Sequence, residues 1–329
     1  MEKLFGVTMG DSSGVGPEIL LKAFAAGQVK VSMIAFGDLE ALKFYNDRLA
    51  CGVSLREIAK SVEYSPGPLN VIDAGIMSRQ DVSVGKLSAK SGQAAREYVV
   101  SAARAALAGE IAAMITLPMN KEATRLSDPH FTGHTELIGD VCGATDVTIM
   151  LVSEQLVVTH VSTHVSLLTA IARAKKERIA KIIRLTCEAM MRLKESPRIA
   201  VAGLNPHAGE NGLFGDEEIR EIRPAVEWAQ SQGLPVDGPF PPDTLFYLAV
   251  RKKKFDAIVC MYHDQGHVPL KLLDFEGGVN VTLGLPIIRT SVDHGTAFNI
   301  AGQGVASTAS FIQALDFAIG LAKGQQGHP

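Results

Sequence analysis

Short apolar runs rich in β-branched residues alternate along this chain with longer stretches in which apolar residues recur at helical spacing. The strand-like runs are residues 4–9, 33–36, 70–73, 112–116, 147–152, 156–162, 199–204, 257–262 and 279–283. Strands that alternate with helices in this way predict an α/β fold with a largely parallel core sheet. Because no long linker rich in Pro, Gly or Ser separates two halves, we expect two lobes between which the chain crosses.

The helical stretches are residues 17–24, 91–107, 167–194, 216–232 and 308–323. Pro17 opens the first of them at a first-turn position, where its missing N–H costs little. Asp216, Glu217 and Glu218 place negative charge on the first turn of the fourth stretch, which suits the helix dipole. The stretch 167–194 predicts one long helix.

The composition is that of an ordinary soluble globular protein, with 47% hydrophobic and 20% charged residues among 329. At roughly 150 residues per domain, this length corresponds to about two domains. A formal net charge of -3 provides no strong positive field for nucleic acid or an anionic membrane. No apolar run reaches the roughly 18 residues of a membrane span, and no signal-peptide core precedes Asp11. We therefore expect a cytoplasmic protein without nucleic-acid or membrane partners.

Histidine carries the strongest chemical signal. His164, His207 and His263 each lie where a predicted strand gives way to a loop. Ligands of open α/β sheets bind outside the carboxyl ends of strands, so three imidazoles there could hold one divalent cation. The alternative is that each is an ordinary hydrogen-bonded histidine. Asp264 could be a further ligand or a partner of the neighbouring His263 ring. The four cysteines form no Cys-x-x-Cys pair, which argues against a thiolate zinc site.

A second group of residues suits an anion. Lys271, Asn280 and Arg289 follow His263 within a stretch rich in glycine and apolar residues. A cationic side chain between apolar strands needs an anionic partner. A ligand's phosphate or carboxylate would satisfy it, and a neighbouring Asp or Glu would do so equally well.

Glycine-rich segments mark three further candidate sites. In residues 9–18 a Gly-rich turn links a strand to a helix, where backbone N–H groups can face an anion, although a plain tight turn explains it as well. Gly133 precedes His134 and Thr135, and Thr135 suits a helix N-cap. In residues 293–304 the glycines allow close backbone approach, and the His and Asn side chains there can hydrogen-bond a base or ribose. No Gly-x-Gly-x-x-Gly dinucleotide fingerprint occurs.

Over essentially the whole chain, these segments together resemble the 4-hydroxythreonine-4-phosphate dehydrogenase family of the pyridoxal phosphate pathway. The matching blocks are Gly10-Asp-Ser-Ser-Gly-Val-Gly-Pro-Glu18, Pro118-Met-Asn-Lys-Glu122, Thr132-Gly-His-Thr-Glu136, Asn205-Pro-His-Ala-Gly-Glu210, Pro242-Asp-Thr-Leu-Phe246, Tyr262-His-Asp-Gln-Gly266 and Gly278-Val-Asn-Val-Thr-Leu-Gly-Leu-Pro-Ile-Ile-Arg-Thr-Ser-Val-Asp-His-Gly-Thr-Ala297. The end of the last block, with Ile300-Ala-Gly-Gln-Gly304, also looks like the NAD-adenosine segment of the isocitrate and isopropylmalate dehydrogenases.

The resemblance implies a homodimer of two-lobed α/β/α subunits of the isocitrate and isopropylmalate dehydrogenase type. The active site would lie in the cleft between the lobes and be shared by the two subunits. Residues 1–128 and 297–329 would form the NAD-side lobe. Residues 129–296 would form the lobe for metal, substrate and dimerisation.

The resemblance also implies a role for each matching residue. The ligands of one divalent ion (Zn, Mg, Mn or Co) would be His164, His207 and His263, with His263 contributed from the partner subunit. The substrate contacts would be His134, Thr135, Lys271, Asn280 and Arg289. The NAD contacts would be Gly10, Asp11, His294, Gly295, Thr296, Ala297 and Asn299. Lys271 would transfer the proton, because a desolvated lysine beside a metal can have a lowered pKa, and Asp243 and Asp264 would be the acidic groups of the catalytic site.

The implied reaction is NAD-dependent oxidation of the C3 hydroxyl of a four-carbon, 4-phosphorylated acid, followed by loss of CO2. One branch would convert 4-phosphohydroxy-L-threonine to 3-amino-2-oxopropyl phosphate. A second branch would convert 4-phospho-D-threonate or 4-phospho-D-erythronate to dihydroxyacetone phosphate. The sequence departs from the biosynthetic members at Ser12-Ser13 and at residues 159–166. This difference favours the second branch. A metal-dependent hydrolase of a phosphorylated small acid, using the same histidines, is the alternative.

Overall fold

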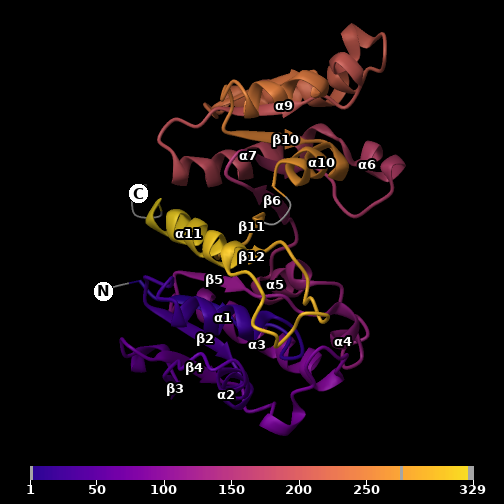
Figure 1. Cartoon of the computed structure of the whole chain (residues 1–329). Coiled ribbons are helices and arrows are strands. Elements are labelled where there is room, and N and C mark those ends of the chain that lie inside the picture. The colour runs from indigo at the N-terminus through magenta and orange to yellow at the C-terminus, as the bar shows by residue number, and fades with distance from the viewer. Residues whose placement is uncertain (1–2, 275–276, 325–329) are drawn as a thin grey trace. The chain divides into compact units, whose positions relative to one another are not determined.

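The computed structural model describes residues 3–274 and 277–324 and confirms a mixed α/β fold built on an extensive sheet (Figure 1). The chain divides into two compact units, of which the first comprises Met1–Val147 and Leu285–Ala322 and the second mainly Thr148–Gly284. Unit 1 therefore joins the first part of the chain to the stretch that follows residue 284, whereas unit 2 is formed mainly by the middle of the chain.

Unit 1 contains six parallel strands covered by helices. Their order is β3 (Leu55–Ile58), β4 (Leu69–Asp73), β2 (Met33–Gly37), β1 (Phe5–Thr8), β5 (Ala113–Thr116) and β12 (Arg289–Val292). The helices are α1 (Gly16–Ala25), α2 (Leu39–Arg48), α3 (Ala89–Leu107), α4 (Lys121–Arg125), α5 (His134–Cys142) and most of α11 (Ala309–Gly324). The central strands β1 and β2 are buried along their whole length, as expected for parallel strands covered on both faces.

Unit 2 contains a mixed run of strands. Their order is β11 (Val279–Leu283), β6 (Thr148–Val152), β7 (Val157–His160), β10 (Ala257–Cys260), β8 (Ile199–Ala202) and β9 (Val236–Phe240). Strand β6 is antiparallel to β11 and β7, and the remaining pairs are parallel. The helices are α6 (Leu167–Arg173), α7 (Lys176–Leu193), α8 (Arg223–Ser231), α9 (Pro242–Val250) and α10 (His263–Leu273).

A strand forms within each of the strand-like runs predicted from the sequence, and most strand pairs are parallel as expected. Strands β3, β9 and β12 were not predicted. Their sequences, Leu-Arg-Glu-Ile, Val-Asp-Gly-Pro-Phe and Arg-Thr-Ser-Val, are too polar or too rich in Gly and Pro to register as buried strands. Pairing with already formed neighbours stabilises them.

The prediction of one helix over residues 167–194 was wrong. The chain leaves the helix at Ala174 and Lys175, and Lys175 is extended with φ -103° and ψ 148°. The Lys176 backbone N–H donates to the Glu221 carboxylate over 2.9 Å and the Lys175 ammonium lies 2.9 Å from the same group. A distant acidic residue thus caps a new helix, which no local periodicity could reveal.

The predicted lobe boundaries fell at residues 128/129 and 296/297, whereas the compact units divide at 147/148 and 284/285. Residues 1, 2 and 325–329, predicted for the NAD-side lobe, and 275 and 276, predicted for the other, lie outside the described residues. The functional assignment of the two lobes stays a prediction. Among the helices of residues 3–274 and 277–324, none is both long and apolar enough to span a bilayer.

Candidate functional site

The three candidate metal ligands of unit 2 follow adjacent parallel strands. His164 lies after β7, His263 opens α10 after β10, and His207 lies after β8, and these strands are neighbours in the order β7-β10-β8. Parallel strands end at the same edge of a sheet, which is where ligands bind in open α/β folds. The topology therefore brings together His164 and His263, which are 99 positions apart in the sequence.

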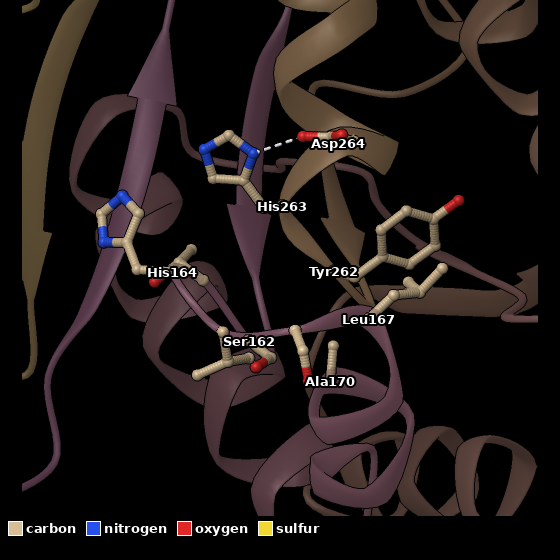
Figure 2. Close-up of a pocket in the computed structure, with 10 residues that line it drawn as sticks. Ser162, His164, Leu167, Ala170, Tyr262, His263 and Asp264 are labelled. Carbon is tan, nitrogen blue, oxygen red and sulfur yellow. Dashed lines mark hydrogen bonds and ion pairs between the residues drawn. The ribbon is translucent and has the colours of Figure 1, made fainter.

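His164 and His263 share one pocket of roughly 430 Å³. Their ring centroids are 5.6 Å apart, and Figure 2 shows the two rings side by side while the Tyr262 ring points away from them. The Asp264 Oδ1 lies 2.6 Å from Nδ1 of His263. A carboxylate can only accept, so Nδ1 carries the proton and Nε2 keeps the lone pair that a metal or substrate would use.

His207 lines a second pocket of roughly 420 Å³, together with Asp243, Tyr262 and Gln265. Tyr262 borders both pockets, so they are neighbours in unit 2. Within one chain, no three His, Cys, Asp or Glu side chains of residues 3–274 and 277–324 converge tightly enough to hold a metal. A single chain therefore brings two of the predicted ligands together and leaves the third beside them.

Two histidines that the sequence argument did not assign complete a ring cluster. The His267 ring stacks on His263 with centroids 3.5 Å apart and planes 12° from parallel. His160, at the end of β7, is fully buried and its Nε2 lies 3.2 Å from Nδ1 of His267. Residues 263 and 267 are one turn apart on α10, so their spacing signals one helix face once the helix is recognised.

Several candidate residues have left-handed backbone conformations. The φ angle is 51° at His164, 52° at His207 and 42° at Ala297. Such conformations cost roughly 1–2 kcal/mol per residue outside glycine. Strained residues of this kind persist where the surrounding structure holds them, and they concentrate at functional sites.

Unit 1 holds a cationic cluster around Arg289 and His134. Arg289 opens β12 and is 3% exposed, and its Nε and Nη2 donate to the Thr116 hydroxyl over 3.2 and 2.7 Å. Burial lowers the pKa of Arg289 to about 10, opposed by the nearby Glu136, so the guanidinium stays charged at neutral pH. A buried charge of this kind needs an anion, and a phosphate accepts from both edges of the guanidinium.

His134 is the neutral member of this cationic cluster. Its Nε2 is buried without a hydrogen-bond partner in the described part of the chain. Burial holds the pKa of His134 well below its usual 6.5, and the positive charges of Arg289 and Lys121 lower it further. A Cβ built on Gly133 would lie 3.6 Å from the Lys121 Nζ, so this ammonium also lies at the start of α5. Lys121 was not among the site residues predicted from the sequence.

Thr135 is the second residue of α5, and the predicted N-cap role was wrong. Helix α5 begins at His134, and its N-cap is Gly133 in an extended conformation with φ 166°. Placing the cap two residues earlier puts His134 in the first turn, beside Arg289 and Lys121.

Lys271 and Asn280 belong to unit 2. Lys271 lies in the last turn of α10 and is half-buried. Asn280, on β11, has a buried Oδ1 without a hydrogen-bond partner among the residues described. An unsatisfied buried amide oxygen is costly unless a ligand or water donates to it.

The candidate NAD segments of unit 1 lie against each other. The Val15 backbone N–H donates to the Thr296 carbonyl over 3.0 Å, and a Cβ on Gly14 would approach that carbonyl to 2.8 Å. Gly10 has a φ of 74°, and a Cβ there would lie 2.4 Å from the Pro118 carbonyl. Glycine is therefore required at both turn positions for this close packing.

Asp11 is fully buried in the same turn. Its Oδ1 accepts from the Ser13 backbone N–H over 2.8 Å and from the Ser91 hydroxyl, while Oδ2 has no hydrogen-bond partner in residues 3–274 and 277–324. Burial raises the pKa of Asp11 despite the bonds from Ser91 and Ser13. The other candidates in this region, His294, Gly295 and Asn299, are exposed.

Comparison with known proteins identifies the family. The model of the Pyridoxal phosphate biosynthetic protein PdxA family matches residues 29–318. A D-threonate 4-phosphate dehydrogenase of Pectobacterium atrosepticum is 42% identical over 98% of this chain and 100% of its own length. A 4-hydroxythreonine-4-phosphate dehydrogenase of Beijerinckia indica is 45% identical over 96% of this chain and 94% of its own.

A solved structure agrees with these relatives. The crystal structure of a 4-hydroxythreonine-4-phosphate dehydrogenase from Klebsiella pneumoniae is 43% identical, with a TM-score of 0.86 over 97% of this chain and 99% of that one. The predicted dehydrogenase class is confirmed, and the hydrolase alternative has no support. This chain belongs to the PdxA family of pyridoxal phosphate biosynthetic proteins.

Proposed function

We propose that this chain oxidises the C3 hydroxyl of a four-carbon, 4-phosphorylated acid with NAD and a divalent metal, and then releases its carboxylate as CO2. The observation that carries the proposal is the full-length similarity to relatives named 4-hydroxythreonine-4-phosphate and D-threonate 4-phosphate dehydrogenases. Both names describe a phosphorylated four-carbon substrate. The cationic cluster of unit 1 supports this substrate class.

Arg289 and His134 are the proposed phosphate contacts. The buried guanidinium supplies charge and two-pronged hydrogen bonding, and the neutral imidazole supplies one N–H without adding charge. Thr135, in the same first turn of α5, adds a hydroxyl and a backbone N–H at the positive end of the helix dipole. Asn280 is the proposed contact of unit 2, since its orphaned Oδ1 can accept from a substrate hydroxyl or amine.

Lys271 is the proposed proton acceptor for the C3 hydroxyl, with Asp243 and Asp264 as the acidic groups of the site. Asp264 fixes the proton of His263 on Nδ1. We expect Lys271→Ala to bind substrate with little change in KM while kcat falls by roughly 100-fold or more. Steady-state kinetics followed by NADH absorbance provide the measurement. Turnover at the wild-type rate would remove Lys271 from proton transfer.

His164, His207 and His263 are the proposed ligands of the divalent ion. Two of them already share a pocket with Asp264, and neutral imidazole with carboxylate is a donor set that suits Zn, Mn or Co. When bound, the ion supplies a Lewis acid that lowers the pKa of the substrate hydroxyl and polarises the resulting ketone. The proposed NAD contacts are Gly10, Asp11, His294, Gly295, Thr296, Ala297 and Asn299. When bound, NAD supplies the hydride acceptor.

The proposed assembly is a homodimer of isocitrate dehydrogenase-like, two-lobed subunits in which each site, in the cleft between lobes, takes His263 from the other chain. Exposed apolar side chains on α6 and α10 support an interface in unit 2. Leu167 and Leu168 on α6 are 59% and 79% exposed, and Leu272 on α10 is 86% exposed. Large exposed apolar patches mark interaction surfaces.

The experiment that tests the function compares three substrates side by side. We expect NADH formation with 4-phosphohydroxy-L-threonine, 4-phospho-D-threonate or 4-phospho-D-erythronate, and its loss on addition of a chelator. The preferred substrate assigns the branch, and we expect a phospho-sugar acid because Ser12-Ser13 and residues 159–166 depart from the biosynthetic pattern. Absence of NADH formation with all three would refute the proposal.

A further inference from the structure

His207 lies in a left-handed helical turn that is unusual for a protein chain. His207, Ala208, Gly209, Glu210 and Asn211 all have positive φ, between 43° and 77°. Only one of the five is glycine, so the other four adopt a backbone conformation that is unfavourable for residues with a side chain. A turn strained in this way persists only where the surrounding structure holds it.

A buried carboxylate provides that support. Glu218 is 1% exposed and opens the π-helical turn η4 (Glu218–Ile222) that precedes α8. Its Oε1 accepts from the backbone N–H groups of Leu204 and Asn205, each over 2.7 Å. Its Oε2 accepts from the Asn205 amide over 2.8 Å. Both oxygens of Glu218 are therefore used on the segment that leads from β8 into the turn.

Three glycines let the turn close around this carboxylate. A Cβ on Gly209 would lie 2.6 Å from the Glu218 Oε2, and one on Gly203 would lie 3.0 Å from the Ala208 Cα. A Cβ on Gly215 would lie 2.5 Å from the Asn205 amide nitrogen. The turn, its carboxylate and its entry segment thus fit together without space for a side chain at these positions.

We propose that Glu218 is a positioning residue that holds the left-handed turn 207–211 and so presents the His207 imidazole to the divalent ion of the site. Glu218 touches neither the imidazole nor the pocket of His207, which is lined by Asn205, Asp243 and Tyr262 among others. It acts through the backbone that carries His207. The inference rests on the proposed metal role of His207 and extends it to a residue outside the pocket.

The test uses Glu218→Gln in the full-length chain. Glutamine keeps the shape but turns one acceptor into a donor that faces the Asn205 amide, so the turn loses support. We expect the dissociation constant for Co²⁺, measured by calorimetry on metal-free protein, to rise roughly tenfold or more. Hydrogen exchange of the backbone amides of residues 203–211 should also become faster, and this second measurement does not require a metal.

Glu217→Gln is the matched control. Glu217 accepts from the same Asn205 amide over 2.7 Å but is more exposed than Glu218, and the backbone N–H groups of Leu204 and Asn205 donate to Glu218 instead. A glutamine oxygen there can still accept this bond, so we expect Co²⁺ affinity and exchange to remain as in the wild type. Ala208→Gly added to Glu218→Gln should recover part of the lost affinity, because glycine adopts the left-handed conformation at little cost.

A double-mutant cycle with His207→Ala separates positioning from general destabilisation. If Glu218 acts through His207, Glu218→Gln causes no further loss of Co²⁺ affinity once His207 is gone. An equal loss in both backgrounds, or wild-type affinity in Glu218→Gln, would overturn the inference. Failure of the wild-type protein to bind Co²⁺ at all would instead refute the metal site of the proposed function. This outcome is distinct from a failure of the inference, which is seen only by comparing the variants with a wild type that binds Co²⁺.

Discussion

At the scale of single residues, the Arg289 guanidinium defines the chemistry of unit 1. It is buried, it remains charged, and it donates to the neutral Thr116 hydroxyl. Beside it lie a neutral His134 and the Lys121 ammonium, with Glu136 as the nearby acidic group. Such an excess of positive charge at a desolvated position favours a multiply charged anion over water.

Replacing Arg289 with lysine tests this cationic cluster. Lysine keeps the charge but loses the planar fork, and a hydrogen bond to a charged group contributes about 1.5–3 kcal/mol, so we expect KM for the phosphorylated acid to rise roughly ten- to hundredfold. Kinetics by NADH absorbance provide the measurement. Arg104→Lys, on the exposed face of α3, serves as the control and should leave KM unchanged. An unchanged KM in Arg289→Lys would show that the phosphate binds elsewhere.

His134 makes stability depend on pH. Its pKa is held well below 6.5 in the folded chain by burial, so on acidification the unfolded chain takes up a proton that the folded chain does not. The stability contributed by neutral His134 is therefore present above pH 6.5 and lost as pH falls. Relative to His134→Gln, the wild-type protein should lose about 1.4 kcal/mol more between pH 7.5 and 5.5. Urea unfolding of both proteins at each pH measures this, and parallel curves would contradict it.

At the scale of elements, helix α10 shows how the histidine cluster is built. Gly266 faces β7, and a Cβ there would lie 2.5 Å from Nε2 of His160. The absent side chain lets the buried His160 ring reach His267, which in turn stacks on His263. The strand, the glycine and the helix together fix the orientation of a proposed metal ligand.

Gly266→Ala should therefore destabilise the protein. The His160 ring is fully buried and cannot move aside freely, and overpacking of this kind costs about 1–3 kcal/mol. Urea denaturation at neutral pH measures the change in the free energy of unfolding. Gly295→Ala is the matched control, because a Cβ at that exposed position would meet no atom within 4 Å. Equal stability of both variants would mean that α10 shifts without penalty.

The sequence predicted the elements better than their junctions. The apolar runs located the central strands, because burial on both faces requires continuous apolar sequence. The three strand ends that carry His164, His207 and His263 followed from the same runs. The break between α6 and α7 depends on Glu221, 45 residues after the amide that it caps. The bracing of the His207 turn by Glu218 likewise depends on backbone conformation, and no local pattern encodes either contact.

At the scale of the whole molecule, the proposed sharing of sites between two chains has a sharp test. His207→Ala and His263→Ala proteins should each be inactive alone. If His263 serves the partner's site, random mixing of the two proteins gives mixed dimers with one intact site, and about a quarter of wild-type activity should return. Recovery is measured by NADH absorbance after the subunits are exchanged in mild denaturant. No recovery would place all ligands within one chain, where His164 and His263 rings are already 5.6 Å apart.

The assembly of unit 1 from two separate parts of the chain has a consequence for protein synthesis. Strand β12 pairs with β5, and the Thr290 hydroxyl donates to the Ala314 carbonyl of α11, so these partners leave the ribosome only after residues 148–284 of unit 2 have been made. Unit 2 lies almost wholly within residues 148–284 and has its strands available earlier. Until then the nascent β5 has an open edge, and its Ala-Met-Ile-Thr sequence is a surface that chaperones would bind.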